Sequence, residues 1–136
     1  MKYLIDTNVL SDSRNRRKPR VTEWMMDQDV DTVATSAIVL LELERGVRRV
    51  ERRDTASGRF LRDWLDGQVR SVFDGKILPV DDEVAVRAAR LMSPDPKPHF
   101  DCLIAATALA HGLTVVTQNV RDFSSMGVDI LDPTAA

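Results

Sequence analysis

The sequence predicts an α/β fold, a three-layer α/β/α sandwich around a central, mainly parallel sheet. Two observations predict it. Short unbroken apolar runs at residues 2–5 and 114–117 have the length and composition of buried parallel strands. Between them lie segments whose apolar residues recur at helical spacing. Strands that alternate with helices form a parallel sheet with helices on both faces.

The other elements follow from spacing and from turn residues. We expect helices at residues 19–28, 36–53, 55–73, 82–92, 100–111 and 120–125. Further strands are expected at residues 31–35, 77–80 and 128–131. Pro79 predicts that the strand 77–80 lies at an edge or ends there. The helix 55–73 is expected to bury Phe60 and Trp64 on its apolar face.

Polar and proline residues predict where these elements begin and end. Ser36 is expected to be the N-cap of the helix that follows it, and Asp81 or Asp82 that of the helix ending at residue 92. Three prolines within residues 93–99 predict an extended linker, because proline is excluded from helix interiors.

Length and composition place the chain among folded, non-membrane proteins. At 136 residues it has the size of one domain, residues 1–136. Its longest apolar runs are about five residues, far below the roughly 20 that span a bilayer. The first apolar run is interrupted at Asp6, unlike a secretory signal. Cys102 is the only cysteine, which favours a reducing compartment, and we expect the cytoplasm.

The arginines are concentrated in two segments. The net charge of −2 does not by itself indicate a nucleic-acid-binding protein. Residues 14–20 and 45–53 are nevertheless strongly basic. Each segment is either a solvated surface or a binding site for RNA phosphates; in the second case the affinity for RNA falls steeply with salt.

Asp6 stands at the carboxyl end of the first strand, followed by Thr7 and Asn8. In open α/β sheets this edge is where ligands bind. The strand 114–117 also ends in a polar cluster, which begins at Thr117. We therefore expect these two strands to be neighbours at the point where the strand order reverses.

Glu42 and Asp101 are the acids most unusually placed. Glu42 lies among aliphatic residues of its helix and needs a partner, either a cation or an ion pair with Arg45 or Arg49. Glu44 points the other way and is expected to pair with Arg48. Asp101 begins a helix of small residues, so it is either a cap or a ligand.

The sequence after residue 117 offers two more oxygen-bearing side chains, Asn119 and Asp122. They lie three residues apart on a helical turn and are either an Asx turn or part of the site. Oxygen ligands with no cysteine and no suitably spaced histidine are typical of Mg²⁺ or Mn²⁺. Such a site suits the hydrolysis of a phosphodiester.

Taken together, these motifs resemble the PIN-domain ribonucleases, in particular the VapC and FitB group of bacterial toxins. The resemblance rests on Asp6-Thr7-Asn8, on residues 36–47, on Asp101 before Ile104-Ala105-Ala106-Thr107, and on residues 116–123. It implies a PIN-like sandwich and an Mg²⁺- or Mn²⁺-dependent endoribonuclease acting on structured RNA such as tRNA or rRNA. It also implies homodimers, larger toxin–antitoxin assemblies, and inhibition by a cognate antitoxin.

The same resemblance assigns residue roles. The family's three core acids correspond to Asp6, Glu42 and Asp101. The hydroxyls that support them correspond to Thr7 and Thr117, and we group Asn8 with these supporting residues. Some members carry a fourth aspartate where this chain has Asn119, so either Asn119 or Asp122 completes the metal site. The residues implied to bind RNA are Arg14, Arg16, Arg17, Arg45 and Arg49. Two alternatives stay open, a non-catalytic PIN-like module that binds a partner or RNA and a free-standing RNA-processing nuclease.

Overall fold

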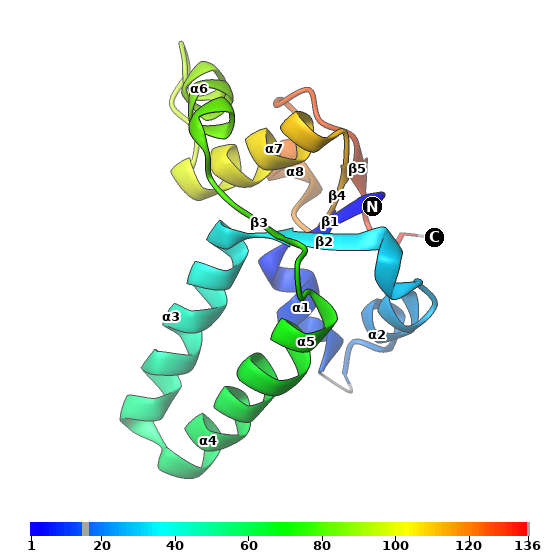
Figure 1. Cartoon of the computed structure of the whole chain (residues 1–136), viewed down its shortest axis with the longest axis vertical. Coiled ribbons are helices and arrows are strands. Elements are labelled where there is room, and N and C mark those ends of the chain that lie inside the picture. Colours follow the sequence, from blue (N-terminus) through cyan, green and yellow to red (C-terminus); the bar gives the residue numbers. More distant parts are fainter. Residues whose placement is uncertain (15–16, 136) are drawn as a thin grey trace.

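The centre of the fold is a parallel sheet whose strands lie in the order β3-β2-β1-β4-β5 (Figure 1). The structure is a computed structural model and describes residues 1–14 and 17–135. Within these residues the strands are β1 (Tyr3–Ile5), β2 (Val33–Ser36), β3 (Ile77–Leu78), β4 (Thr114–Val116) and β5 (Ile130–Leu131). All four pairings are parallel, with Leu4 opposite both Ala34 and Val115.

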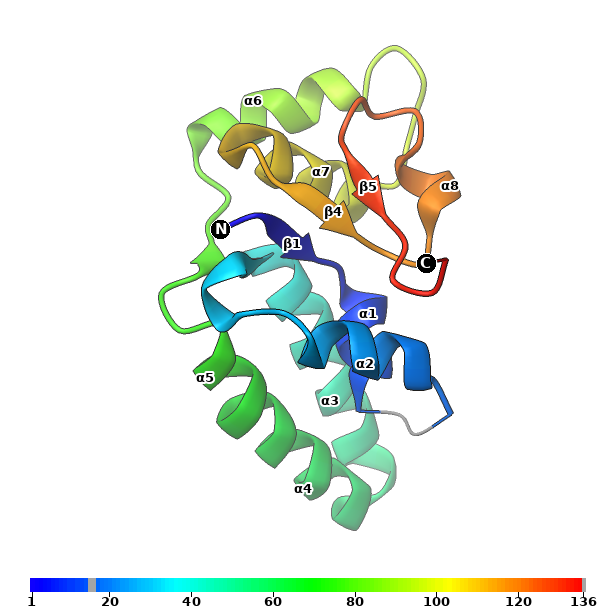
Figure 2. The same cartoon turned by 90° about the vertical axis from the view of Figure 1, so that its right-hand side faces the viewer.

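Helices cover both faces of this sheet, which confirms the predicted three-layer sandwich. On one side lie α6 (Asp82–Leu91) and α7 (His99–His111), and on the other lie α1 (Thr7–Ser13), α3 (Ala37–Arg53) and α4 (Thr55–Asp63). The same division is visible in the turned view (Figure 2). The shorter elements are α2 (Pro19–Met26), η1 (Val30–Thr32), η2 (Trp64–Val69), α5 (Arg70–Val72) and α8 (Val120–Phe123).

The strand order reverses between β1 and β4. From β1 the chain moves outward to β2 and β3, and it then returns to the other side of β1 to form β4 and β5. The predicted pairing of the first strand with strand 114–117 is therefore confirmed. Asp6 and Thr117 follow directly after the two central strands, so their side chains meet at one edge of the sheet.

The core explains why these strands lack alternation. Leu4, Ile5, Val115 and Val116 are completely buried because helices pack against both faces of the sheet. Helix α7 contributes small residues that allow close packing, among them Ala105 and Ala108. No helix of the described residues is long and apolar enough to cross a membrane.

Helices α3 and α4 form an antiparallel pair that extends away from the sheet (Figure 1). Arg62 holds the pair together: its guanidinium donates to both carboxylate oxygens of Glu44, at 2.8 and 2.7 Å, and also to Glu51. The predicted Glu44–Arg48 pair is confirmed at 3.1 Å. These arginines lower the pKa of Glu44. Glu44 is thus a structural acid, in contrast to Glu42 two residues earlier.

Several predicted element boundaries are wrong. Helix α1 was not expected, although Asp6 caps it by accepting a hydrogen bond from the Thr7 backbone. The second strand begins at Val33, because residues 30–32 form a 3₁₀ turn. The expected helix 55–73 is divided by the π-helical segment η2.

The expected burial of the helix 55–73 is only partly confirmed. Trp64 is buried at 8% exposure, whereas Phe60 is 67% exposed. Phe60 therefore does not belong to the core, and its ring is free to contact a partner or ligand.

Two helical glycines should respond oppositely to alanine. A Cβ on Gly58 would lie 2.6 Å from the Glu51 Cα, whereas a Cβ on Gly46 would have no atom within 4 Å. We expect Gly58→Ala to lower the free energy of unfolding by about 1–3 kcal/mol through overpacking. Gly46→Ala should raise it by about 0.5–1 kcal/mol, because alanine is the better helix former. Urea unfolding followed by circular dichroism measures both, and effects of the same sign contradict the packing of α3 against α4.

Candidate active site

Asp6 is buried, at 4% exposure, and three donors hold its carboxylate. The Thr7 backbone N–H donates to Oδ1 at 2.8 Å. The Thr117 hydroxyl donates to Oδ2 at 2.8 Å, and the Asn8 side-chain amide donates to the same oxygen at 3.0 Å. Burial raises the pKa of Asp6 and these hydrogen bonds oppose that rise. The carboxylate is therefore fixed in one orientation at the end of β1.

Thr117 and Asn8 fasten the ends of β1 and β4 together. The Thr117 hydroxyl donates to Asp6 and accepts from the Asn8 amide at 3.2 Å and from the Asn119 backbone N–H at 3.0 Å. Asn8 Oδ1 accepts from the Gln118 backbone N–H at 3.1 Å. Since one proton and two lone pairs are all that a hydroxyl offers, Thr117 is fully used. The structure thus places all three predicted supporting residues, Thr7, Asn8 and Thr117, against the acids.

Glu42 comes to this site from α3. Its Oε1 accepts a hydrogen bond of 2.7 Å from the Thr7 hydroxyl. No ion pair joins Glu42 to Arg45 or Arg49 in the part of the chain that the structure describes. The guanidinium of Arg45 lies instead over the Phe100 ring, 5.4 Å from its centre. The sequence left Glu42 either a bound cation or an ion pair with Arg45 or Arg49 as its partner, and the structure excludes the ion pair.

Asp101 does not cap its helix. Helix α7 begins at His99, so Asp101 lies inside its first turn, and no side chain caps the helix. Its half-buried carboxylate accepts no hydrogen bond from residues 1–14 or 17–135. Burial raises its pKa to about 6, and the negative charges of Asp6, Asp122 and Glu42 add to this. The Asp101 carboxylate is therefore destabilised in its charged form, and none of the residues that the structure describes compensates it.

The three acids thus form an electrostatically coupled group. Glu42 raises the pKa of Asp6, and both raise that of Asp101. Within the described residues no three Asp, Glu, His or Cys side chains are arranged to hold a metal ion on their own. An ion bound by this group would therefore need additional oxygen ligands, such as water or phosphate, beside the carboxylates.

Asn119 and Asp122 lie at the start of α8, and both are exposed. The Asp122 backbone N–H donates to the Asn119 carbonyl at 3.1 Å. The charge of Asp122 acts on Asp101, which places it near the acidic group. Gln118, which the sequence analysis did not single out, also supports the site, because its side-chain amide donates to Asp12 of α1 at 2.8 Å. Gln118 could have been identified from the sequence because it lies in the polar cluster that follows β4.

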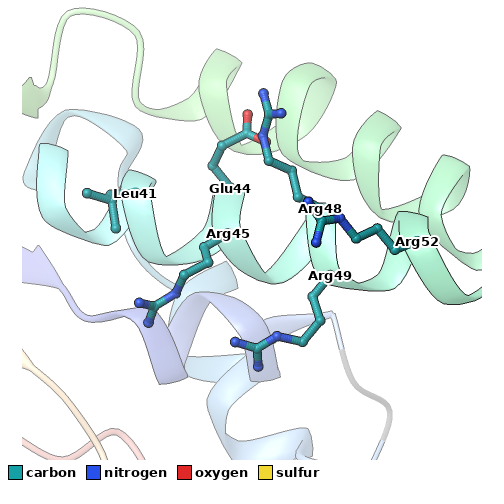
Figure 3. A pocket seen from close by; sticks show the side chains of 6 residues that line it. All are labelled: Leu41, Glu44, Arg45, Arg48, Arg49 and Arg52. Atoms are coloured by element: carbon teal, nitrogen blue, oxygen red, sulfur yellow. The ribbon is translucent and has the colours of Figure 1, made fainter.

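The predicted RNA-binding arginines occupy different surroundings. Arg45 and Arg49 extend to the same side of α3, where a cavity of about 520 Å³ is lined mainly by arginines (Figure 3). Arg14 lies over the Trp64 ring, 5.2 Å from its centre. Arg17 is exposed, and Arg16 lies outside the described residues. Arg45 and Arg49 thus share one basic surface on α3, whereas Arg14 lies at the C-terminal end of α1.

Comparisons with known proteins identify relatives of nearly the same length. The family model of the PIN domain matches residues 3–128. The VapC ribonuclease Y4jK of Sinorhizobium fredii is 32% identical, covering 96% of both chains. Toxin FitB of Neisseria gonorrhoeae is 34% identical over the same shares. The crystal structure of FitAcB from Neisseria gonorrhoeae has a TM-score of 0.91 at 31% identity, and the match covers 98% of this chain and 99% of that one.

The raised pKa of Asp101 predicts a pH-dependent stability in metal-free buffer. Folded Asp101, with a pKa of about 6, binds its proton more tightly than the unfolded chain does. The contribution of this tighter proton binding to the free energy of unfolding is therefore fully present below the unfolded pKa, near 4. It is lost as the pH rises through about 6. Asp101→Asn removes this charge while nearly preserving the shape.

We expect the melting temperature of Asp101→Asn to exceed that of the wild type increasingly as the pH rises from 4 to 7. Differential scanning calorimetry in EDTA measures this difference. Asp95→Asn, at an exposed acid in the proline-rich loop, serves as the control. A difference for Asp101→Asn that does not change with pH contradicts the electrostatic coupling of the acids.

Proposed function

Because the chain belongs to the PIN domain family, we propose that it is a metal-dependent endoribonuclease and the toxin of a toxin–antitoxin pair. Its substrate is structured RNA such as tRNA or rRNA, and its place of action is the cytoplasm. One observation carries the proposal: the carboxylates of Asp6, Glu42 and Asp101 act on one another at the ligand-binding edge of the sheet, with no cation from the described residues to neutralise them.

The donor atoms of this group fit Mg²⁺ or Mn²⁺. Every candidate ligand is an oxygen, and hard cations prefer oxygen. Within the described residues Asp6 Oδ1 and Glu42 Oε1 each accept one hydrogen bond, so each retains a lone pair, and the Asp101 oxygens accept none. Mg²⁺ commonly keeps several waters and uses only a few carboxylates together with substrate phosphates. No three of the described Asp, Glu, His and Cys side chains are placed to hold an ion together, so we propose that some of these carboxylates bind the ion directly and the others bind it through water.

In this proposal Asp6, Glu42 and Asp101 are the catalytic acids and the metal ligands, each binding the ion directly or through a water molecule. When bound, the ion lowers the pKa of water and stabilises the charge that develops on the phosphate. Thr7, Asn8 and Thr117 are positioning residues, because their hydrogen bonds orient Asp6 and Glu42. Asp122 is the proposed fourth acid, since its charge reaches Asp101. Asn119 is proposed to line the site beside it.

The arginines supply the proposed contacts to RNA. Arg45 and Arg49 lie three and seven residues after Glu42 on the same helix, so phosphates bound there lie next to the acids. Arg14, at the C-terminal end of α1, and the exposed Arg17 are the other proposed RNA contacts, and Arg16 is grouped with them from the sequence alone. Because these positive charges attract phosphates that the acids repel, they would hold the substrate while the ion neutralises the site.

The proposed partners are a cognate antitoxin and a second copy of the chain, within a larger toxin–antitoxin assembly. The proposal is supported by the similarity to Toxin FitB over nearly the whole length of both chains. A toxin that cleaves cellular RNA must be inhibited by a partner until it is needed. The site described above is open to solvent at Asn119 and Asp122, which leaves it accessible to substrate or inhibitor.

Cleavage of RNA by the purified protein tests the function. With total RNA and Mn²⁺ or Mg²⁺, we expect new 5′ ends at defined positions and none in EDTA. Asp6→Asn and Asp101→Asn should lower the cleavage rate by more than about 100-fold, since loss of even an outer-shell partner typically costs about 10–100-fold. Thr117→Val should fall within that smaller range.

Asp95→Asn, which changes an exposed acid in the loop before α7, is the matched control and should cleave as the wild type does. Cleavage that survives Asp6→Asn or proceeds in EDTA rejects the metal-dependent mechanism. Binding of RNA without cleavage at any Mn²⁺ concentration identifies a non-catalytic module instead.

A further inference from the structure

A small cavity lies directly beside Glu42, between helices α1, α3 and α4. Its volume is about 150 Å³, and its walls include Val47, Leu61 and Trp64. The hydroxyls of Thr7 and Ser11 and the carboxylate-bearing Glu42 also line it. The cavity therefore combines an apolar interior with a polar side that faces the acidic group. A pocket of this kind suits a flat, partly polar ring rather than a charged or purely apolar group.

Gly46 keeps this cavity open. It lies four residues after Glu42, hence on the same face of α3, and it is among the residues lining the cavity. Helical side chains point back toward the N-terminus of their helix, so a side chain at position 46 would extend toward Glu42. A Cβ built there meets no atom within 4 Å, which shows that the space is empty. Glycine is unfavourable within a helix, and packing does not require it at this position.

Arg14 joins this cavity to a second one. Its guanidinium lies over the Trp64 ring and lines both the inner cavity and an outer one of about 420 Å³. Phe60, 67% exposed, lines the outer cavity. No acid of the described residues pairs with Arg14. An unpaired cation thus stands between two cavities that each contain an aromatic ring.

We propose that the inner cavity binds one unpaired base of the RNA substrate, adjacent to the phosphate that is cleaved. The neighbouring base stacks on Phe60, and Arg14 contacts the backbone that links the two nucleotides. This inference rests on the proposed ribonuclease function and specifies which part of the RNA the site binds.

A base within a duplex cannot enter such a cavity, so the cut falls in a loop, a bulge or an end.

The charges favour RNA over a protein side chain as the occupant. The alternation of ring-lined cavity, cation and ring-lined cavity matches the alternation of base, phosphate and base along a single strand. Because the inner cavity shares Glu42 with the acidic group, its occupant is continuous with whatever lies at the acids. Within a nucleotide only the ribose separates the base from its phosphate, so a base bound in this cavity leaves an adjoining phosphate close to the acids.

Filling the cavity tests the proposal. Gly46→Leu should lower the cleavage rate of total RNA by about tenfold or more, the scale of one lost base contact, at an unchanged or higher melting temperature. Gly46→Ala, which is expected to fold at least as well as the wild type, should show a smaller loss. Ala85→Leu adds the same side chain to the exposed face of α6 and should cleave normally. The proposal is overturned if Gly46→Leu cleaves total RNA at the same positions as Ala85→Leu and at a rate within about twofold of it.

A binding measurement reads the cavity independently of cleavage. In a Trp24→Phe background Trp64 is the only tryptophan, so its fluorescence reports on the cavity. At least one 5′-mononucleotide at millimolar concentration should change this signal, whereas ribose 5-phosphate, which lacks the base, should not. Gly46→Leu should abolish the response. If the wild type cleaves no RNA, the proposed function is rejected. If the fluorescence responds equally to mononucleotides and to ribose 5-phosphate, or responds to neither, the base pocket is rejected. Loss of inhibition by a partner protein with cleavage intact assigns the cavity to that partner instead.

Discussion

The enclosure of the Asp6 carboxylate by donors that follow the two central strands is the interaction on which the site depends. Thr117 brings its hydroxyl from the end of β4, and Asn8 and the Thr7 backbone come from the first turn of α1. A buried carboxylate without such donors would take up a proton. These hydrogen bonds hold Asp6 in one orientation and also fasten β1 to β4 at the point where the strand order reverses. The position of every other candidate ligand is defined relative to this point.

Two glutamates on α3 show how the fold separates structure from function. Glu44 is neutralised by Arg62 and Arg48 and joins α3 to α4. Glu42, two residues earlier, accepts a hydrogen bond from the Thr7 hydroxyl alone among the described residues, and it interacts electrostatically with Asp6 and Asp101. Asp101 lies beside them with a raised pKa and no hydrogen-bond or ion-pair partner from the described residues. Uncompensated charge lowers stability, and it is typical of sites that have a task other than folding.

The sequence predicted the sheet and its central pair of strands because buried parallel strands give an unbroken apolar signal and polar clusters mark their ends. It missed α1, since Asp6 had been considered only as a ligand and not as the residue that caps a helix. Asp101 resembled a cap because the run of small residues that begins directly after it was taken as the body of the helix, whereas α7 already begins at His99. Phe60 was expected in the core because periodicity cannot show how far a pair of helices extends beyond the sheet. The cavity beside Glu42 depends on three helices and was beyond the reach of any local pattern.

The central claim is that Asp6, Glu42 and Asp101 share a divalent ion, and anomalous diffraction from crystals grown with Mn²⁺ tests it most directly. We predict an anomalous peak at the carboxyl edge of β1 and β4, about 2 Å from carboxylate oxygens of Asp6 and Asp101, which disappears in Asp101→Asn crystals. Crystals of active protein that show Mn²⁺ bound elsewhere, or no Mn²⁺ near these oxygens, would contradict the account.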